Sequence, residues 1–291
     1  MAWLVGQSLI NGILAGGVYS MIAVGVTIVF GVMRIINFAS GAFMMLGMYY
    51  TLIAFNLIGT EVYFLLPFVI LMAAAFGYIA FRLSIVPILN KERIAAVIAT
   101  VGLSFFLQNV VQIFFGSIPV TIPSVMRGAS FALGPFTITY VRVTIFFSAL
   151  LFTILISLFV SKTFFGKCMR ATSESAEIAE MLGINTRKMY IMAWTIGITL
   201  SAIAGLLITP MYMVDSGVGG LFRSVGLMAV VLGGLGDIRG AFIGGIALGV
   251  AEALVSALVA PDLGPAGMFV LFLVVLYFKP NGLFGKGERT A

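Results

Sequence analysis

Histidine is absent from this sequence, cysteine occurs once, at Cys168, and charged residues make up only 9% of the 291 positions. A disulfide framework and any histidine-based metal or acid–base site are thereby excluded, and we expect no metal site. Hydrophobic residues reach 62% and glycines number 34, a composition that soluble domains do not tolerate. Cys168 is expected to be an ordinary thiol in a reducing compartment.

Positive charge is in excess, with sixteen lysines and arginines against ten acidic residues. In a soluble protein this excess would favour nucleic acid binding. Here the basic residues lie in short gaps between apolar runs, which is typical of a membrane protein oriented by its charges. No nucleic acid partner is expected.

The apolar runs have the length needed to cross a bilayer, about 20 residues. They cover residues 9–32, 36–58, 64–81, 94–116, 143–160, 189–214, 226–235, 241–260 and 267–278. The seventh run is too short for an ordinary span and is expected to be tilted or broken, with its backbone buried in protein or lining a cavity. We predict an all-α polytopic membrane protein with eight or nine transmembrane helices in one domain, residues 1–291.

Basic residues sort to two sides if all nine runs cross. One side collects Arg34, Arg82, Lys91, Arg93, Lys162, Lys167, Arg170, Arg187, Lys188, Arg239, Lys279, Lys286 and Arg289, and the other has Arg127, Arg142 and Arg223. The richer side is expected to be cytoplasmic. The N-terminus then lies outside and the C-terminus inside; a re-entrant seventh run would leave eight complete spans.

The most polar stretch, residues 166–183, lies in an expected cytoplasmic loop of about residues 162–188. Ser173 is the expected N-cap of a helix of about ten residues. Glu174 and Glu177 would then occupy its first turn, where the helix dipole favours negative charge. Gly183 is the expected terminator, and Thr186 would cap the next spanning helix.

An apolar stripe marks this expected helix. Ile178, Met181 and Leu182 share one face at spacings of three and four residues. Such a stripe outside the bilayer predicts a helix that either lies on the membrane surface or is covered by a partner. Another loop, residues 117–142, carries Pro119, Pro123 and Pro135 and is expected to hold some extended structure, either as a docking surface or as a plain connector.

Few polar residues lie within the spans. Gln108 and Gln112 share one helix face, and Asn37 and Ser40 lie near the start of the second run. Substrate contact and structural hydrogen bonding both remain open for these side chains. Glu252 is the one carboxylate deep in a run, for which we favour a structural or gating role, with Arg34 as a partner if the fold brings it near.

Glycines four residues apart, such as Gly236, Gly240 and Gly244, favour close helix packing over substrate contact. The run GGLGDIRG at residues 233–240 superficially suggests a phosphate loop, but it lacks the Lys-Ser/Thr ending, and no other stretch supplies it. The chain is therefore expected to bind no ATP through such a loop, and its energy source must be another subunit or an ion gradient.

Five motifs in one order resemble the permease subunits of branched-chain amino acid ABC transporters. They are MRIINFASGAFMMLG at residues 33–47, the run 95–116, GKCMRATSESAEIAEMLGINTRKMYIMAWTIGITLSAIAGLL at 166–207, GLMAVVLGGLGDIRGAFIGG at 226–245 with Glu252, and KPNGLFG at 279–285. Each motif is weak alone, but the series covers nearly the whole chain.

This resemblance implies an importer subunit of the bacterial inner membrane that works by alternating access. Its implied partners are a second homologous permease, two ATP-binding subunits that use the ATP, and a soluble substrate-binding protein; the chain itself would hold no cofactor and perform no covalent chemistry. The implied coupling segment contains Arg170, Glu177, Ile178, Ala179, Leu182 and Gly183. The expected substrate pathway contains Asn37, Ser40, Gly41, Gln108 and Gln112.

The sequence also departs from the pattern. Many family members carry a histidine at the position of Ser40 and an acidic residue near Ala42, and this sequence has neither. Branched-chain amino acids remain the first expected solute, with amides, urea and other small amino acids or acids as alternatives. An ion-coupled secondary carrier is the alternative from another class. It would need charged coupling residues in its spans, and Glu252 is the one candidate. A purely structural membrane subunit would leave the patterned cytoplasmic helix unexplained.

Overall fold

The computed structural model describes residues 2–89 and 91–285. The longer helices are α1 (Ala2–Met33), α2 (Ser40–Ile58), α3 (Leu66–Ala80), α4 (Arg93–Phe115), α5 (Tyr140–Lys162), α8 (Thr186–Ile208), α9 (Val218–Gly233), α10 (Ile238–Leu258) and α11 (Gly264–Phe278). The shorter elements are helical turns at Val62–Leu65, Phe81–Ile85, Val86–Ile88 and Pro261–Leu263, helices α6 (Phe164–Glu174) and α7 (Ala176–Met181), and strands β1 (Ser130–Leu133) and β2 (Phe136–Thr139).

Eight helical segments in the described chain are long and apolar enough to cross a membrane. The predicted all-α polytopic class is therefore confirmed. The short seventh run corresponds to α9, which has 16 residues and falls below the length of the other spans. Lys286 and Arg289, which were counted with the cytoplasmic charges, and the C-terminus itself lie outside the described residues.

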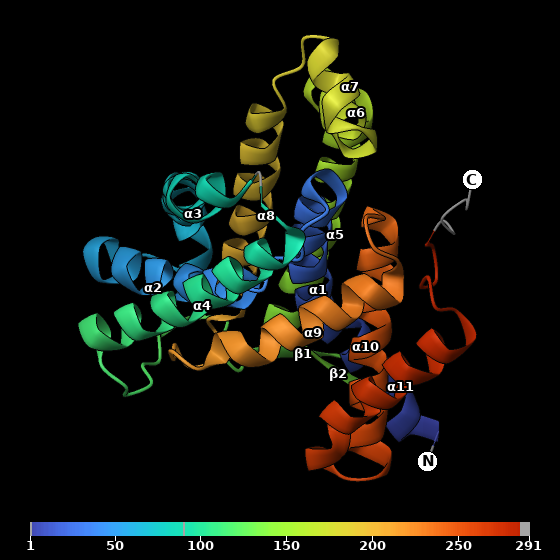
Figure 1. Ribbon diagram of the computed structural model, residues 1–291. Coiled ribbons are helices and arrows are strands. Elements are labelled where there is room, and N and C mark those ends of the chain that lie inside the picture. The colour runs from blue at the N-terminus through green and yellow to red at the C-terminus, as the bar shows by residue number, and fades with distance from the viewer. Residues whose placement is uncertain (1, 90, 286–291) are drawn as a thin grey trace.

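Helix α1 runs through the middle of the molecule, with α2, α3 and α4 on one side and α10 and α11 on the other (Figure 1). Among the described helices, the packing of α1 against α10 is the most extensive, because glycines let the two backbones meet. A Cβ atom added to Gly16 would lie 2.6 Å from Cα of Ile246, and one added to Gly249 would lie 2.6 Å from Cα of Gly16. Backbone contact of this kind is what the four-residue glycine spacing predicts.

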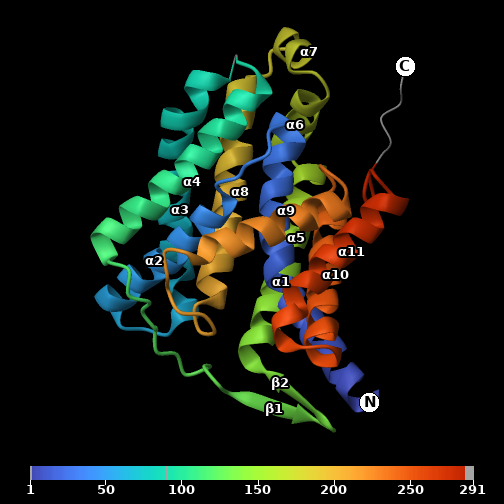
Figure 2. The same cartoon turned by 60° about the horizontal axis from the view of Figure 1, so that its bottom comes forward.

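The two ends of the molecule differ in structure (Figure 2). The N-terminal turn of α1 and the β1–β2 hairpin lie at one end, and α6 and α7 lie at the other. Trp3 Nε1 donates a 2.8 Å hydrogen bond to the carbonyl of Pro135, and Gln7 both donates to and accepts from the backbone of Thr137. The hairpin confirms the extended structure expected between residues 117 and 142.

Helix α2 crosses α8 at a similar glycine contact, which gives a test of the packing. A Cβ atom added to Gly47 would lie 2.6 Å from Cα of Ala202, whereas one added to Gly102 on α4 would meet nothing within 4 Å. We expect Gly47→Ala to lower the free energy of unfolding by about 1–3 kcal/mol, the usual effect of overpacking. Thermal melting of the purified protein measures this effect. Gly102→Ala is the matched control, and an equal loss in both variants would contradict the argument.

Candidate functional site

The connection between α1 and α2 is a helix break with its own hydrogen bonds. Arg34 has φ of 55°, in the left-handed region that ends a helix, and α2 resumes only at Ser40. Within the break, the amide of Ala39 donates to Asn37 Oδ1 at 2.9 Å and that of Phe38 donates to Thr100 Oγ1 at 3.3 Å. Side chains thus satisfy backbone groups that a continuous helix would have paired. The break fixes where the N-terminus of α2 begins.

The N-terminal ends of α2 and α9 meet each other. Gly41 and Gly219 face one another so closely that a Cβ atom on Gly219 would lie 2.5 Å from the carbonyl oxygen of Gly41. A Cβ atom on Gly41 would lie 2.7 Å from Cβ of Arg223. Only glycine permits this approach. Two helix N-termini, which carry partial positive charge, are therefore brought together.

A small recess with both polar and apolar lining opens beside this meeting point and is called the recess below. Its empty volume, including the part that is open to the surroundings, is about 290 Å³. The residues that line it are Ala42, Met45, Ser104, Phe105, Gln108, Ser216, Gly219, Gly220 and Arg223. Nη1 of Arg223 donates to Oγ of Ser104 at 3.4 Å. Ser104 lies near the middle of α4, so the guanidinium reaches the middle of a helix long enough to span a membrane.

Only some of the residues expected to line the substrate pathway lie at the recess. Gln108 lines it, and Gly41 forms the contact between α2 and α9 next to it. Asn37 and Ser40 are buried just before and at the start of α2 and are not among the residues that line the recess. The hydroxyl of Ser40 has no hydrogen-bond partner among the described residues. Gln112 lies apart from the recess, exposed near the end of α4, where it donates to Oγ of Ser117 at 2.7 Å.

Arg223, Ser104 and Ser216 are residues of the recess that the sequence analysis missed. Arg223 was placed in an extracytoplasmic loop, but α9 begins at Val218 rather than near residue 226, which puts Arg223 in its second turn. The sequence did contain a sign of this earlier start, because the apolar residues Phe222 and Val225 have the three-residue spacing of a helix face. The structure buries both of them.

The polar loop after α5 folds as two helices instead of one. Ser173 was expected to be an N-cap, but it lies inside α6 and donates to the carbonyl of Arg170 at 2.7 Å. Ser175 is the actual cap of α7, because its extended backbone breaks the chain and its Oγ accepts from the amide of Ile178 at 3.3 Å. Glu174 therefore ends α6, while Glu177 lies in the first turn of α7.

Helix α7 presents apolar side chains to its surroundings. Ile178, Met181 and Leu182 are 60%, 77% and 74% exposed, whereas Ala179 on the other face is buried. Gly183, with φ of 80°, ends the helix as expected. Nη2 of Arg170 donates to the carbonyl of Ser161 at 3.4 Å and holds α6 to the end of α5.

The join between α7 and α8 is also defined by side chains. The hydroxyl of Thr186 bonds the carboxylate of Glu180, so α7 is tied directly to α8. Thr186 was expected to cap α8, but Asn185 does so, accepting from the amide of Lys188 at 3.0 Å. Thr186 is instead the first residue of the helix.

Glu252 lies in the last third of α10 and has a different partner from the one suggested. Its Oε2 accepts a 2.6 Å hydrogen bond from the hydroxyl of Tyr19 on α1. Arg34 instead donates to the carbonyl of Ser173 at 3.5 Å, so the suggested pairing of Arg34 with Glu252 is wrong. The Tyr19–Glu252 bond links α1 to α10.

Two of the three glycines, Gly240 and Gly244, lie at close backbone contacts within α10. A Cβ atom on Gly244 would lie 3.1 Å from the amide nitrogen of Gly233, and one on Gly240 would lie 2.9 Å from the carbonyl carbon of Gly233. Gly236 precedes α10 and has φ of 88°, and a Cβ atom there would lie 3.7 Å from Cα of Gly31, an ordinary van der Waals distance. In residues 2–89 and 91–285, no three acidic, cysteine or histidine side chains gather as metal ligands would.

Comparison with known proteins gives consistent matches over nearly the whole chain. The family model described as branched-chain amino acid transport system / permease component matches residues 8–277. The high-affinity branched-chain amino acid transport system permease proteins LivH of Escherichia coli K12 and BraD of Pseudomonas aeruginosa are 34% and 33% identical to it, each over 97% of this chain and 96% of the relative.

A solved structure, PsaBC from Streptococcus pneumoniae in complex with Fab, has a similar fold. Its TM-score is 0.53 at 12% sequence identity, and the match covers 96% of this chain and 94% of that one. At this identity the likeness concerns the fold alone.

Proposed function

Because this chain belongs to the family of branched-chain amino acid transport system permease components, we propose that it is the permease subunit of an ATP-driven importer that carries branched-chain amino acids by alternating access. It is a polytopic membrane transport protein that works with other transporter subunits. The proposal adds the solute, the energy source and the composition of the complex. One second permease, two ATP-binding subunits and a soluble binding protein complete it.

The observation that carries the proposal is the position of Arg223. Its guanidinium lies at the middle of α4, beside two helix N-termini, where it matches the carboxylate of an amino acid. The amide of Gln108 and the hydroxyl of Ser104 accept hydrogen bonds, as an ammonium group requires. Met45 and Phe105 provide apolar surface for an aliphatic side chain.

Energy coupling is assigned to α6 and α7, with a cleft of an ATP-binding subunit covering the exposed face of α7. The tie between Glu180 and Thr186 would pass a movement of α7 to α8, and the bond from Arg34 to Ser173 would pass a movement of α6 to α1. In this proposal the chain has no ATPase site of its own, is a single permease domain, and binds no cofactor.

Transport by the reconstituted complex tests the function. Proteoliposomes with the ATP-binding subunits inside and the binding protein outside should take up radiolabelled leucine only when ATP is enclosed. Valine and isoleucine should compete, and urea and acetamide should not. Uptake driven by an ion gradient without ATP would refute the ATP-driven importer and favour the secondary carrier, whereas competition by urea or acetamide alone would change the solute.

The proposed location is the bacterial inner membrane, with α6, α7 and the C-terminus in the cytoplasm. We expect Arg170→Cys to react with a membrane-impermeant maleimide only from the cytoplasm and Arg127→Cys only from outside. Cys168 is buried, and its replacement by alanine provides the background for both variants. The opposite labelling pattern would reverse the topology and place α7 beyond the reach of an ATP-binding subunit.

A further inference from the structure

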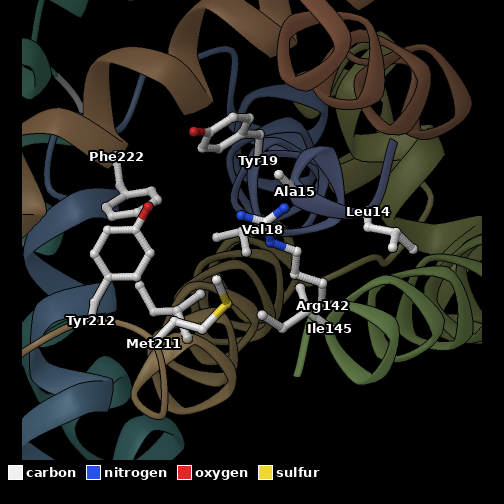
Figure 3. A pocket seen from close by; sticks show the side chains of 10 residues that line it. Leu14, Ala15, Val18, Tyr19, Arg142, Ile145, Met211, Tyr212 and Phe222 are labelled. Carbon is white, nitrogen blue, oxygen red and sulfur yellow. The ribbon is translucent and has the colours of Figure 1, made fainter. Parts of the chain in front are cut away.

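A second cavity, called the outer cavity here, lies between α1, α5 and the segment that joins α8 to α9 (Figure 3). Its empty volume, including the part that is open to the surroundings, is about 390 Å³. Most of its wall is apolar, formed by Leu14, Ala15, Val18, Ile145, Ile208 and Met211. Phe222 lines this cavity while its neighbour Arg223 lines the recess, so the first turns of α9 contact both spaces.

Arg142 is the charged residue of the outer cavity. Figure 3 shows its guanidinium extending from α5 toward Ala15 and Val18 on α1, with Tyr212 and Phe222 beyond. Within residues 2–89 and 91–285, no carboxylate lies within 4.0 Å of this guanidinium, and it donates no hydrogen bond. Arginine keeps its charge in proteins, and a partly buried cation against an apolar wall is costly without an anion. Among the described residues the nearby carboxylate, that of Glu252, is bonded to Tyr19 and not to Arg142, so the guanidinium is open to an anionic group from elsewhere.

Glu252 does not fill this role. Its carboxylate is bonded to the hydroxyl of Tyr19, and Glu252 is not among the residues that line the cavity. The aromatic wall is also ordered: Phe222 packs at 6.1 Å from the ring of Tyr19 and at 5.6 Å, edge to face, from that of Tyr212. In the part of the chain that the structure describes, this wall combines packed aromatic and aliphatic side chains with a guanidinium that has no ion-pair partner. Such a wall suits a small solute that has a carboxylate and an aliphatic body.

We propose that the outer cavity binds the carboxylate of an aliphatic amino acid on Arg142, with the aliphatic side chain against Val18, Ile145 and Met211. The identity of the solute as an amino acid rests on the proposed function, whereas the need for an anionic head and an apolar body follows from the cavity itself. Arg142 lies in the first turn of α5, directly after the hairpin. A solute delivered at the hairpin end would meet this site before the recess.

The test compares two probes that differ in charge alone, 4-methylpentanoate and 4-methylpentanamide. Isothermal titration calorimetry on the purified assembled complex, without the binding protein, should show binding of the carboxylate and not of the amide. Arg142→Gln should weaken carboxylate binding by at least about tenfold, the effect of losing one hydrogen bond to a charged group. Arg142→Lys should retain part of the affinity, and Arg127→Gln, which removes an exposed loop arginine, should retain all of it.

Each outcome decides for or against the site. Equal binding of the carboxylate by the wild type and Arg142→Gln, with both proteins melting at the same temperature, would overturn it. A phospholipid is the other source of an anionic head with an apolar body. If mass spectrometry finds less bound phosphatidylglycerol in Arg142→Gln while carboxylate binding is unchanged, the proposal is also overturned. If Arg142-dependent carboxylate binding persists in a complex that fails to transport leucine, the site stands and the proposed function falls.

Discussion

The double variant Ile178→Asp with Leu182→Asp should reach the membrane but fail to bind the ATP-binding subunits. Ile178 on α7 and Leu182, the residue that caps its C-terminus, are both more than half exposed and lie outside the hydrophobic core, so their replacement removes little folding free energy. Burial of each in a partner's cleft would contribute about 1.5–3 kcal/mol to binding, and burying an unpaired carboxylate in the same place costs more. Co-purification of an ATP-binding subunit with the tagged permease measures the loss.

A conservative pair provides the control for this variant. Ile178→Leu with Leu182→Ile keeps the apolar surface of α7 and should co-purify with the ATP-binding subunit as the wild type does. Ala179→Asp is not suitable, because Ala179 is buried and its replacement would disturb the fold. Normal recovery of the complex from the double aspartate variant would remove α7 as the docking helix.

The variant Arg223→Gln should lower the rate of leucine transport by about 10- to 100-fold, the effect of losing a hydrogen bond to a charged group worth about 1.5–3 kcal/mol. The complex should still assemble, because the backbone contact between Gly41 and Gly219 does not involve the guanidinium. Ser104→Ala should have a smaller effect, since it removes a neutral partner of Arg223 at 3.4 Å. Initial uptake rates in proteoliposomes, at saturating binding protein, provide the measurement.

The two glutamines on α4 form a matched pair for the same assay. Gln108→Leu should slow transport, because this side chain lines the recess, whereas Gln112→Leu should transport nearly as the wild type, because Gln112 faces outward and bonds Ser117. Ser40→Leu should slow transport, because Ser40 is buried at the start of α2 and the larger side chain would overpack the region of the helix contact. Unchanged rates for Arg223→Gln and Gln108→Leu would show the recess to be a packing feature of the helices.

The spans could be predicted from the sequence because the length and hydropathy of a run suffice to identify a helix that crosses a bilayer. The start of α9 could not, because hydropathy falls where Gly219, Gly220 and Arg223 occur although the backbone is already helical. That arginine is tolerated in the helix because it reaches a hydroxyl on α4, a contact made only by the tertiary fold. Hydropathy therefore assigned Arg223, the residue on which the proposed function rests, to a loop instead of to α9.

The N-cap in the polar loop was predicted wrongly. Ser173 was expected to be the cap, with Glu174 and Glu177 in the first turn of the helix that it would begin. In the structure Ser175 is the cap of α7, because α6 extends from Phe164 to Glu174 and contains Ser173 in its interior. The exposed stripe of α7 was predicted correctly because it depends on spacing alone. The partner of Glu252 was not, because Tyr19 lies 233 residues away in sequence.

Helix α1 connects the two ends of the molecule mechanically. Its first turns are bonded to the hairpin through Trp3 and Gln7, and Arg34, directly after its last residue, is bonded to α6 through the carbonyl of Ser173. Its 32 residues form one unbroken rod of about 48 Å at 1.5 Å per residue. A displacement of α6 at one face of the protein therefore reaches the hairpin at the opposite face along a single stiff element, with no intervening loop to absorb it.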